Sequence, residues 1–186
     1  MGEEVAQQEF TREDRTRYRE KVRRCLDVFA RMLRESRFDA DAPMTGLEIE
    51  INLVDDLGDP ALKNHEALEA IADPDFQTEL GQFNLEINVH PKQLRDRGFT
   101  EFEDGVRASL NDAETKAARV GAHLVMIGIL PTLAEGHLSP GHMSANPRYR
   151  LISEQILAAR GEDIHIDITG PERLVTTAEM ACEAFQ

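Results

Sequence analysis

The chain of 186 residues has few aromatic side chains and few cysteines. It has no tryptophan, and neither of its two cysteines, Cys25 and Cys182, has a second Cys or a His at the spacing of a metal site. Cys25 falls within an apolar helical pattern, so we expect a small buried side chain there rather than a disulfide partner or a catalytic thiol. No apolar run approaches the roughly 20 residues that span a bilayer.

Basic residues are outnumbered by acidic ones, 21 to 35, which gives a formal net charge of −14. This balance repels nucleic acid and anionic membranes, so neither is an expected partner. The amino terminus is acidic and lacks the basic start and apolar stretch of a signal peptide. The sequence therefore predicts a cytoplasmic protein with one domain over residues 1–186.

What the sequence does contain is one pattern that occurs nearly twice: residues 46–53 are GLEIEINL and residues 81–89 are GQFNLEINV. Each copy alternates apolar and polar side chains, as a β-strand with one buried face does. The polar faces carry only carboxylates and carboxamides: Glu48, Glu50 and Asn52 on the first copy, and Asn84, Glu86 and Asn88 on the second. Oxygen ligands of this kind suit hard divalent cations.

Four acids are therefore candidate ligands of Mg²⁺, and these are Glu48, Glu50, Glu79 and Glu86. Glu79 stands at the entrance of the second strand, seven residues before Glu86. If the two strands pair, the carboxylates crowd one side of the sheet and repel one another. Mg²⁺ ions would relieve this repulsion and hold the phosphates of a substrate. The alternative is an acidic face that is open to water or paired with the Arg-rich segment 12–37.

Apolar residues at helical spacing predict helices at about 12–36, 64–72, 100–120 and 148–160, and from Thr176 onward. Capping boxes are expected at the starts of the first and third helices, from Thr11 with Asp14 and from Thr100 with Glu103. In the first helix one apolar stripe is formed by Tyr18, Val22, Cys25, Phe29 and Met32, with Leu26 and Leu33 alongside.

Strands are expected at 46–53, at 80–89 with Pro91 ending the strand, at 123–130 and at 164–168. A long loop is expected at 134–147. Strands separated by helices, with one antiparallel pair, indicate an α+β domain in which helices pack on one face of a mostly antiparallel sheet.

Three segments together resemble a known family: Gly46-Leu47-Glu48-Ile49-Glu50, Thr78-Glu79-Leu80, and residues 84–91, which are NLEINVHP. They resemble the amino-terminal half of the glutamate–cysteine ligase family, in the branch that includes related carboxylate–amine ligases. The resemblance covers about residues 44–160. It implies a glutamine-synthetase-like catalytic domain, in which a curved antiparallel sheet binds metal–ATP on its concave face. Family members are longer, so the chain is expected to be the amino-terminal part of such a domain.

The activity that this resemblance implies is an ATP-dependent ligation, a reaction of glutathione biosynthesis. The γ-carboxylate of glutamate takes the terminal phosphoryl group of ATP, and the amine of cysteine then attacks the acyl phosphate to form an amide. The positions that ligate Mg²⁺ in the family match Glu48, Glu50, Glu79 and Glu86.

Three further residues are candidates for substrate binding. We interpret Asn84 and Asn88 as groups that orient the substrate or metal-bound water, because they lie on the same strand face as Glu86. Arg148 is a candidate for holding a substrate carboxylate, which an Arg side chain can pair at two points. A different carboxylate or amine substrate, or a truncated non-catalytic module that binds metal or nucleotide, are the alternatives. An incomplete sheet would also leave an unpaired edge, which favours a homo-oligomer.

Overall fold

The computed structural model describes residues 9–38, 43–93, 95–160 and 164–178. Its centre is a four-stranded sheet in the order β2-β3-β1-β4, in which every neighbouring pair is antiparallel. The strands are β1 (Met44–Val54), β2 (Phe76–Thr78), β3 (Asn84–Gln93) and β4 (His123–Val125). The expected α+β class with a mostly antiparallel sheet is confirmed.

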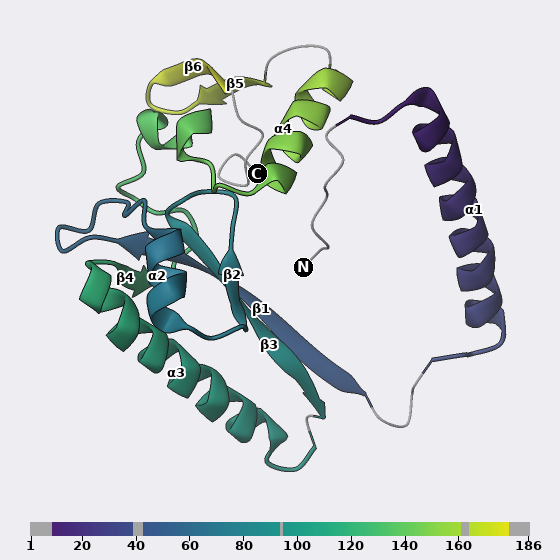
Figure 1. The fold of residues 1–186 in the computed structure, drawn as a ribbon, viewed down its shortest axis with the longest axis horizontal. Helices are drawn as coiled ribbons and strands as arrows, with labels where there is room; N and C mark the ends of the chain where they lie inside the picture. The colour runs from purple at the N-terminus through teal and green to yellow at the C-terminus, as the bar shows by residue number, and fades with distance from the viewer. Residues whose placement is uncertain (1–8, 39–42, 94, 161–163, 179–186) are drawn as a thin grey trace.

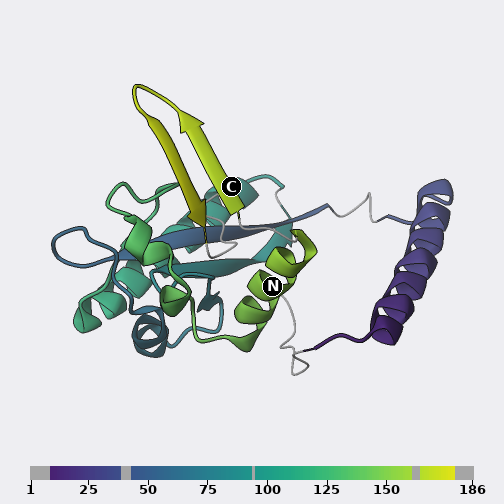
Figure 2. The same ribbon diagram turned by 90° about the horizontal axis from the view of Figure 1, so that it is seen from above.

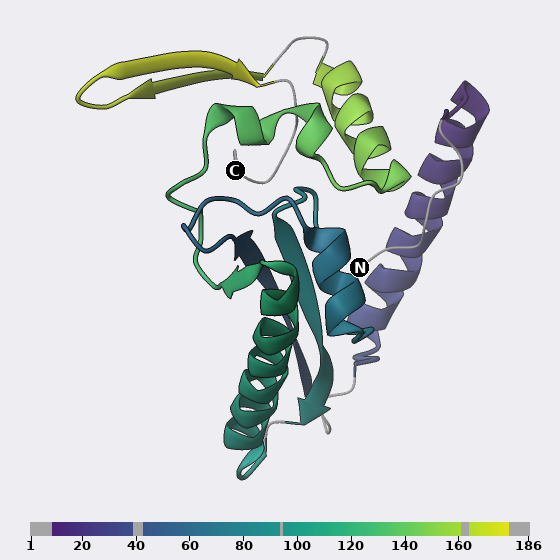
Figure 3. The same cartoon turned by 60° about the vertical axis from the view of Figure 1, so that its left-hand side comes forward.

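Two helices, α2 (Asn64–Ile71) and α3 (Gly98–Ala117), lie side by side on one face of this sheet (Figure 3). The helix α1 (Arg12–Arg34) stands apart from the sheet (Figure 1). Three short 3-10 helices follow α3, at Ala118–Val120, Glu135–Leu138 and Pro140–His142, and then α4 (Pro147–Arg160). The hairpin of β5 (Ile164–Thr169) and β6 (Arg173–Ala178) extends away from the four-stranded sheet (Figure 2).

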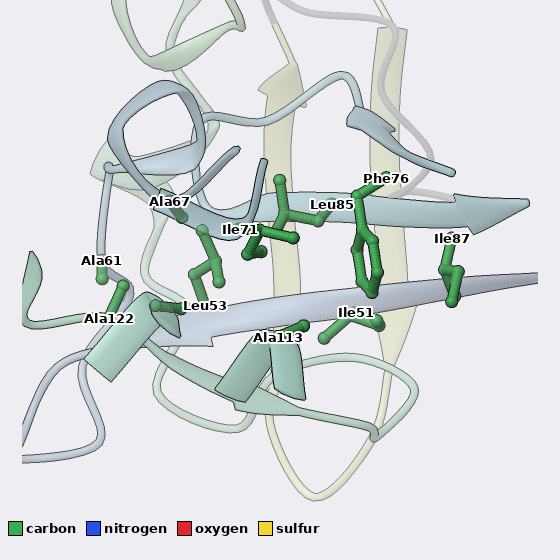
Figure 4. Packing of buried hydrophobic residues seen from close by; sticks show 11 residues of the cluster. Ile51, Leu53, Ala61, Ala67, Ile71, Phe76, Leu85, Ile87, Ala113 and Ala122 are labelled. Atoms are coloured by element: carbon green, nitrogen blue, oxygen red, sulfur yellow. The ribbon is translucent and has the colours of Figure 1, made fainter. Parts of the chain in front are cut away.

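The hydrophobic core lies between the sheet and the helices α2 and α3 (Figure 4). The strands contribute Ile51, Leu53, Phe76, Leu85 and Ile87, and the helices contribute Ala67, Ile71, Ala113 and Ala117. Alternate residues of a strand point to the same side, and the apolar residues Ile51 and Leu53 of the first pattern and Leu85 and Ile87 of the second enter this core. Burying one such large aliphatic side chain stabilises the fold by about 1.5–3 kcal/mol. The polar half of each pattern is thereby turned to the opposite face of the sheet.

The expectation that Pro91 ends the second strand is wrong, because β3 continues to Gln93. Leu47 pairs with Val89 and Thr45 pairs with Lys92, so one residue of β1 lies opposite two residues of β3. Such a bulge is one of the few places where a strand tolerates proline. The strands approach closely here, since a Cβ atom added to Gly46 would lie 3.4 Å from Cγ of Pro91.

Other expected boundaries also differ from the structure. The strand predicted at 80–89 begins only at Asn84, and the strand predicted at 123–130 ends at Val125. The helix predicted from Thr176 onward is wrong over its first residues, which belong to β6, and residues 179–186 lie outside the described part. The helix α3 begins at Gly98 and has no side-chain cap, so the second capping box is wrong.

The first helix behaves as expected locally, but its apolar stripe is not buried. Thr11 and Asp14 form the predicted capping box. No residue of α1 is buried, and Cys25, expected in a core, is exposed. Cys182 lies outside the described residues. Within the described ranges, every helix is too short or too polar to cross a membrane.

Candidate functional site

The two copies of the repeated pattern are neighbours in the sheet, and their polar residues lie opposite one another. The register pairs Glu48 with Asn88, Glu50 with Glu86, and Asn52 with Asn84. Side chains at directly opposite positions of an antiparallel pair have Cβ atoms about 4.5–5.5 Å apart. We call these six residues the acidic face. The sequence-based prediction that the two strands pair and bring their carboxylates together is confirmed by this register.

Glu86 occupies the middle of the acidic face and is only 7% exposed. On one side it lies opposite Glu50, and on the other side β2 places Gln77 opposite it. Glu79 follows two residues after Gln77 and is half-buried. The Leu80 backbone N–H donates to Oε2 of Glu79 at 3.1 Å. Three acids of the predicted set therefore lie on three adjacent segments, with Glu86 between the other two.

The amides of the acidic face hold one end of it in place. Nδ2 of Asn84 donates to Oδ1 of Asn52 at 3.0 Å, and Nδ2 of Asn52 donates to the carbonyls of Ile127 and Gly128 at 3.1 and 3.3 Å. These bonds draw residues 127–128 toward the acidic face. They explain why the apolar run after Val125 does not continue as a strand along β1.

The side chain of Asn88 has an acceptor atom without a hydrogen-bond donor in the described part of the chain. Its Nδ2 donates to Oε1 of Glu86. Its Oδ1 is buried and is the one such side-chain atom of the described residues that lacks a hydrogen-bond partner. Buried acceptors normally have a donor or a water partner. An oxygen in this position, beside Glu86 and opposite Glu48, suits a cation, a metal-bound water or a substrate N–H.

An open cavity of about 540 Å³ lies at the outer end of the acidic face. It is lined by Glu48, Gln77 and Asn88, and also by Asp75 and His90, whose Oδ1 and Nε2 atoms are 3.1 Å apart. Cavities of roughly 300–1,000 Å³ are typical of small-molecule sites. The acidic face therefore borders a space that is large enough for a substrate.

Tyr149, the third residue of α4, lies near Glu79 and Glu86. Its hydroxyl donates to the carbonyl of Thr78 at 2.5 Å. Burial raises the pKa of Tyr149 above its usual value of 10.0, and the negative charges of Glu79 and Glu86 raise it further, against the opposing effects of the Thr78 side chain and of Arg148. Tyr149 is therefore within electrostatic reach of both carboxylates. The sequence indicates its neighbour Arg148 as a candidate but does not mark Tyr149.

Arg148 lies next to this tyrosine. Its guanidinium carbon is 6.0 Å from the centre of the Tyr149 ring, which is within cation–π range. The side chain is half-buried, and the backbone N–H of Arg148 donates to Oδ1 of Asn146 at 2.9 Å. The structure thus brings Arg148 to the same end of α4 as Tyr149, near β2.

Within the described part of the chain, no group of three or more His, Cys, Asp and Glu side chains is arranged to hold a metal ion by itself. The residues present are nevertheless chemically suited to Mg²⁺. The acidic face contributes oxygen atoms and no cationic side chain, and Mg²⁺ is usually bound through one or two carboxylates together with substrate phosphates and waters.

The chain belongs to the glutamate–cysteine ligase family 2 (GCS2), whose sequence model matches residues 44–182. The match begins at the first residue of β1 and leaves α1 outside. No curated protein and no solved structure matches the chain. Family membership supports a ligase of the glutamate–cysteine ligase type.

Proposed function

We propose that the acidic face holds Mg²⁺ and the phosphates of ATP in a ligase that joins the γ-carboxylate of glutamate to the amine of cysteine. The observation that carries this proposal is the register of β1 and β3, which sets Glu50 directly opposite Glu86. Two facing carboxylates with further acids at Glu48 and Glu79 are the ligand type that Mg²⁺ takes. The family match gives the same class of reaction from the sequence.

Glu50 and Glu86 are the residues that we propose as the main Mg²⁺ ligands, with Glu48 and Glu79 on either side of them. Once bound, the metal would neutralise charge on the phosphates of ATP. The buried Oδ1 of Asn88 would accept from a metal-bound water or a substrate N–H, because it has no donor within the described residues. Asn84 would then serve mainly to hold Asn52, to which it is bonded.

Phosphoryl transfer depends on positioning and charge neutralisation more than on a protein nucleophile. The chain's task in this proposal is therefore to hold glutamate so that a γ-carboxylate oxygen faces the terminal phosphorus of ATP. Bond formation there releases ADP and leaves an acyl phosphate. The cysteine amine then attacks the acyl carbon, and phosphate departs. Arg148 is suited to hold the α-carboxylate of an amino-acid substrate, since its guanidinium can pair a carboxylate at two points.

Calorimetric titration of the chain with Mg²⁺ and ATP tests the site. We expect Glu50→Gln and Glu86→Gln each to weaken Mg²⁺ binding at least about tenfold, in the range seen when metal-site groups are lost. Glu101→Gln is the matched control, because Glu101 is an exposed acid on α3, in the helical layer on the other side of the sheet. If Glu50→Gln and Glu86→Gln both leave Mg²⁺ affinity unchanged, the assignment of the site is wrong.

A phosphate-release assay tests the reaction. Release of phosphate from ATP that requires glutamate, and that rises when cysteine is added, is the expected result. Stimulation by a different amine in place of cysteine would support the ligase reaction and contradict cysteine as the amine substrate. Binding of Mg²⁺ and ATP without any release would identify the chain as a binding module and contradict the proposed activity.

A further inference from the structure

The backbone around Glu79 is held in an unusual way. Four consecutive carbonyls, from Thr78 to Gly81, accept hydrogen bonds from residues that are distant in sequence. The Tyr149 hydroxyl donates to Thr78 O at 2.5 Å, and Ser144 Oγ donates to Glu79 O. The Ser144 N–H donates to Leu80 O at 2.8 Å, and Asn64 Nδ2 donates to Gly81 O at 3.2 Å. Glu79 therefore lies in the middle of a backbone segment that is fixed on both sides.

The three donors are buried and connected to one another. Asn64, Ser144 and Tyr149 are 4%, 4% and 9% exposed. Nδ2 of Asn64 also donates to Oγ of Ser144 at 2.7 Å, so Ser144 links α2 to the segment that contains Glu79. Burying polar side chains costs free energy unless they are hydrogen-bonded. The polar side chains at these three positions thus supply donors to the carbonyls of residues 78–81. Apolar side chains in their place would leave these carbonyls without donors.

The network ends beside the carboxylates of the site. The Tyr149 hydroxyl is bonded to the carbonyl of Thr78, directly before Glu79, and the charges of Glu79 and Glu86 both act on Tyr149 by raising its pKa. None of the three donors belongs to the acidic face itself. Their contacts fix the main chain from which the Glu79 side chain projects, and so they restrict where its carboxylate can point.

We propose that Ser144 and Tyr149 are positioning residues for Glu79, which fix the main chain on either side of it and so set the position of its carboxylate at the edge of the acidic face. This inference rests on the proposed function, in which Glu79 is a ligand of Mg²⁺. Loss of groups that orient a metal ligand typically weakens metal binding by about 10- to 100-fold. If Glu79 has already been replaced, loss of an orienting group should therefore not weaken Mg²⁺ binding further.

The first experiment reads the position of Glu79 without any metal. Carboxyl ¹³C resonances of Glu79 and Glu101 are followed by NMR in the wild-type chain and in Tyr149→Phe, which removes only a hydroxyl group. We expect the Glu79 resonance to move while that of Glu101 stays in place. Ser144→Ala is expected to move the same resonance, and Ser144→Thr, which keeps the hydroxyl, to restore it. An unmoved Glu79 resonance in both Tyr149→Phe and Ser144→Ala overturns the inference.

The second experiment reads the consequence for Mg²⁺. Tyr149→Phe is expected to weaken Mg²⁺ binding about tenfold in the wild-type background and not at all in the Glu79→Gln background. An equal loss in both backgrounds would mean that the hydroxyl merely supports the fold, and it contradicts the inference. If the wild-type chain binds no Mg²⁺ while the Glu79 resonance still moves, the proposed function fails and the positioning of Glu79 stands.

Discussion

The two halves of β1 have the same alternating sequence and very different surroundings. In the inner half, residues 51–54, the strand lies between β3 and β4 and under the helices, and Leu53 is 0% exposed. In the outer half, residues 44–50, only β3 is paired, and Leu47 is 39% exposed. The alternation decides which face a side chain joins, whereas the neighbouring segments decide whether that face is buried.

The polar side of β1 also changes from a buried inner end to an exposed outer end, and the type of polar residue changes with it. At the inner end stand the neutral amides Asn52 and Asn84, which are bonded to each other and to main-chain carbonyls. At the outer end stands the exposed Glu48, beside the open cavity. Burial of an uncompensated charge is costly, so amides belong at the buried end and carboxylates toward the open one. Glu86, which is buried in the middle, is the residue for which a cation would matter most.

The largest expected effect comes from truncating leucines in the two halves of β1. Leu53→Ala is expected to lower the free energy of unfolding by about 2–5 kcal/mol, because it leaves a cavity in the core. Leu47→Ala removes the same atoms from the partly exposed end and is expected to cost less than about 1 kcal/mol. Urea unfolding measures both. Equal losses would show that the outer half is as well packed as the inner half.

A smaller effect is expected on the polar side. Asn52→Ala removes the acceptor of Asn84 and the donor to Ile127 and Gly128, and it is expected to cost about 1–3 kcal/mol. Glu48→Ala, at the exposed outer end, is expected to change stability by less than about 0.5 kcal/mol in the absence of metal. Both are read from urea midpoints. A large loss in Glu48→Ala would mean that the outer acids support the fold rather than a ligand.

The inner end of β1 is also expected to respond to pH through His123, which pairs with Val54. The hydrogen bond to Glu114 is the largest cause that raises the pKa of His123 above 6.5, and the hydrogen bond to Asp56 raises it further. A raised pKa in the folded state adds stability that is complete below pH 6.5 and is lost as the pH rises through the folded pKa. The urea midpoint should therefore fall as the pH increases from 6 to about 8. His123→Gln should flatten this slope, and the control His65→Gln should retain it.

The smallest effect is expected in α1, which lies outside the family match. Leu26 is 59% exposed on α1, so Leu26→Glu is expected to change the free energy of unfolding of the sheet by less than about 0.5 kcal/mol. Thermal unfolding monitored through the tyrosines measures this. A marked loss would show that the apolar stripe of α1 is covered in solution.

The acidic face could be predicted from the sequence because it depends on strand alternation, which is local. Glu48, Glu50 and Glu86 needed only a period of two and the assumption that the two strands pair. Ser144 and Tyr149 could not be found in this way, because they reach Thr78 and Glu79 across more than 60 residues of chain. Nothing in their immediate sequence marks them except the nearness of Arg148.

The errors in the fold have a similar origin. The strand predicted at 123–130 stops at Val125 because a side chain, Asn52, takes the carbonyls of Ile127 and Gly128. Periodicity carries no information on such competition between side chain and main chain. The apolar stripe of α1 predicts a buried Cys25, whereas the structure leaves this residue exposed. A stripe predicts which side of a helix would be covered, but not that a covering segment is present.

The register of β1 and β3 has a consequence for how the chain folds. A slip of one residue along β3 would exchange its two faces. Glu86 would then point at α2 and α3, into a layer that now receives Leu85 and Ile87, where an unpaired charge is strongly unfavourable. Mispaired sheets are therefore unable to close over their helices. The same carboxylates that we propose as metal ligands would act during folding as a check on strand alignment, rejecting wrong pairings before the core forms.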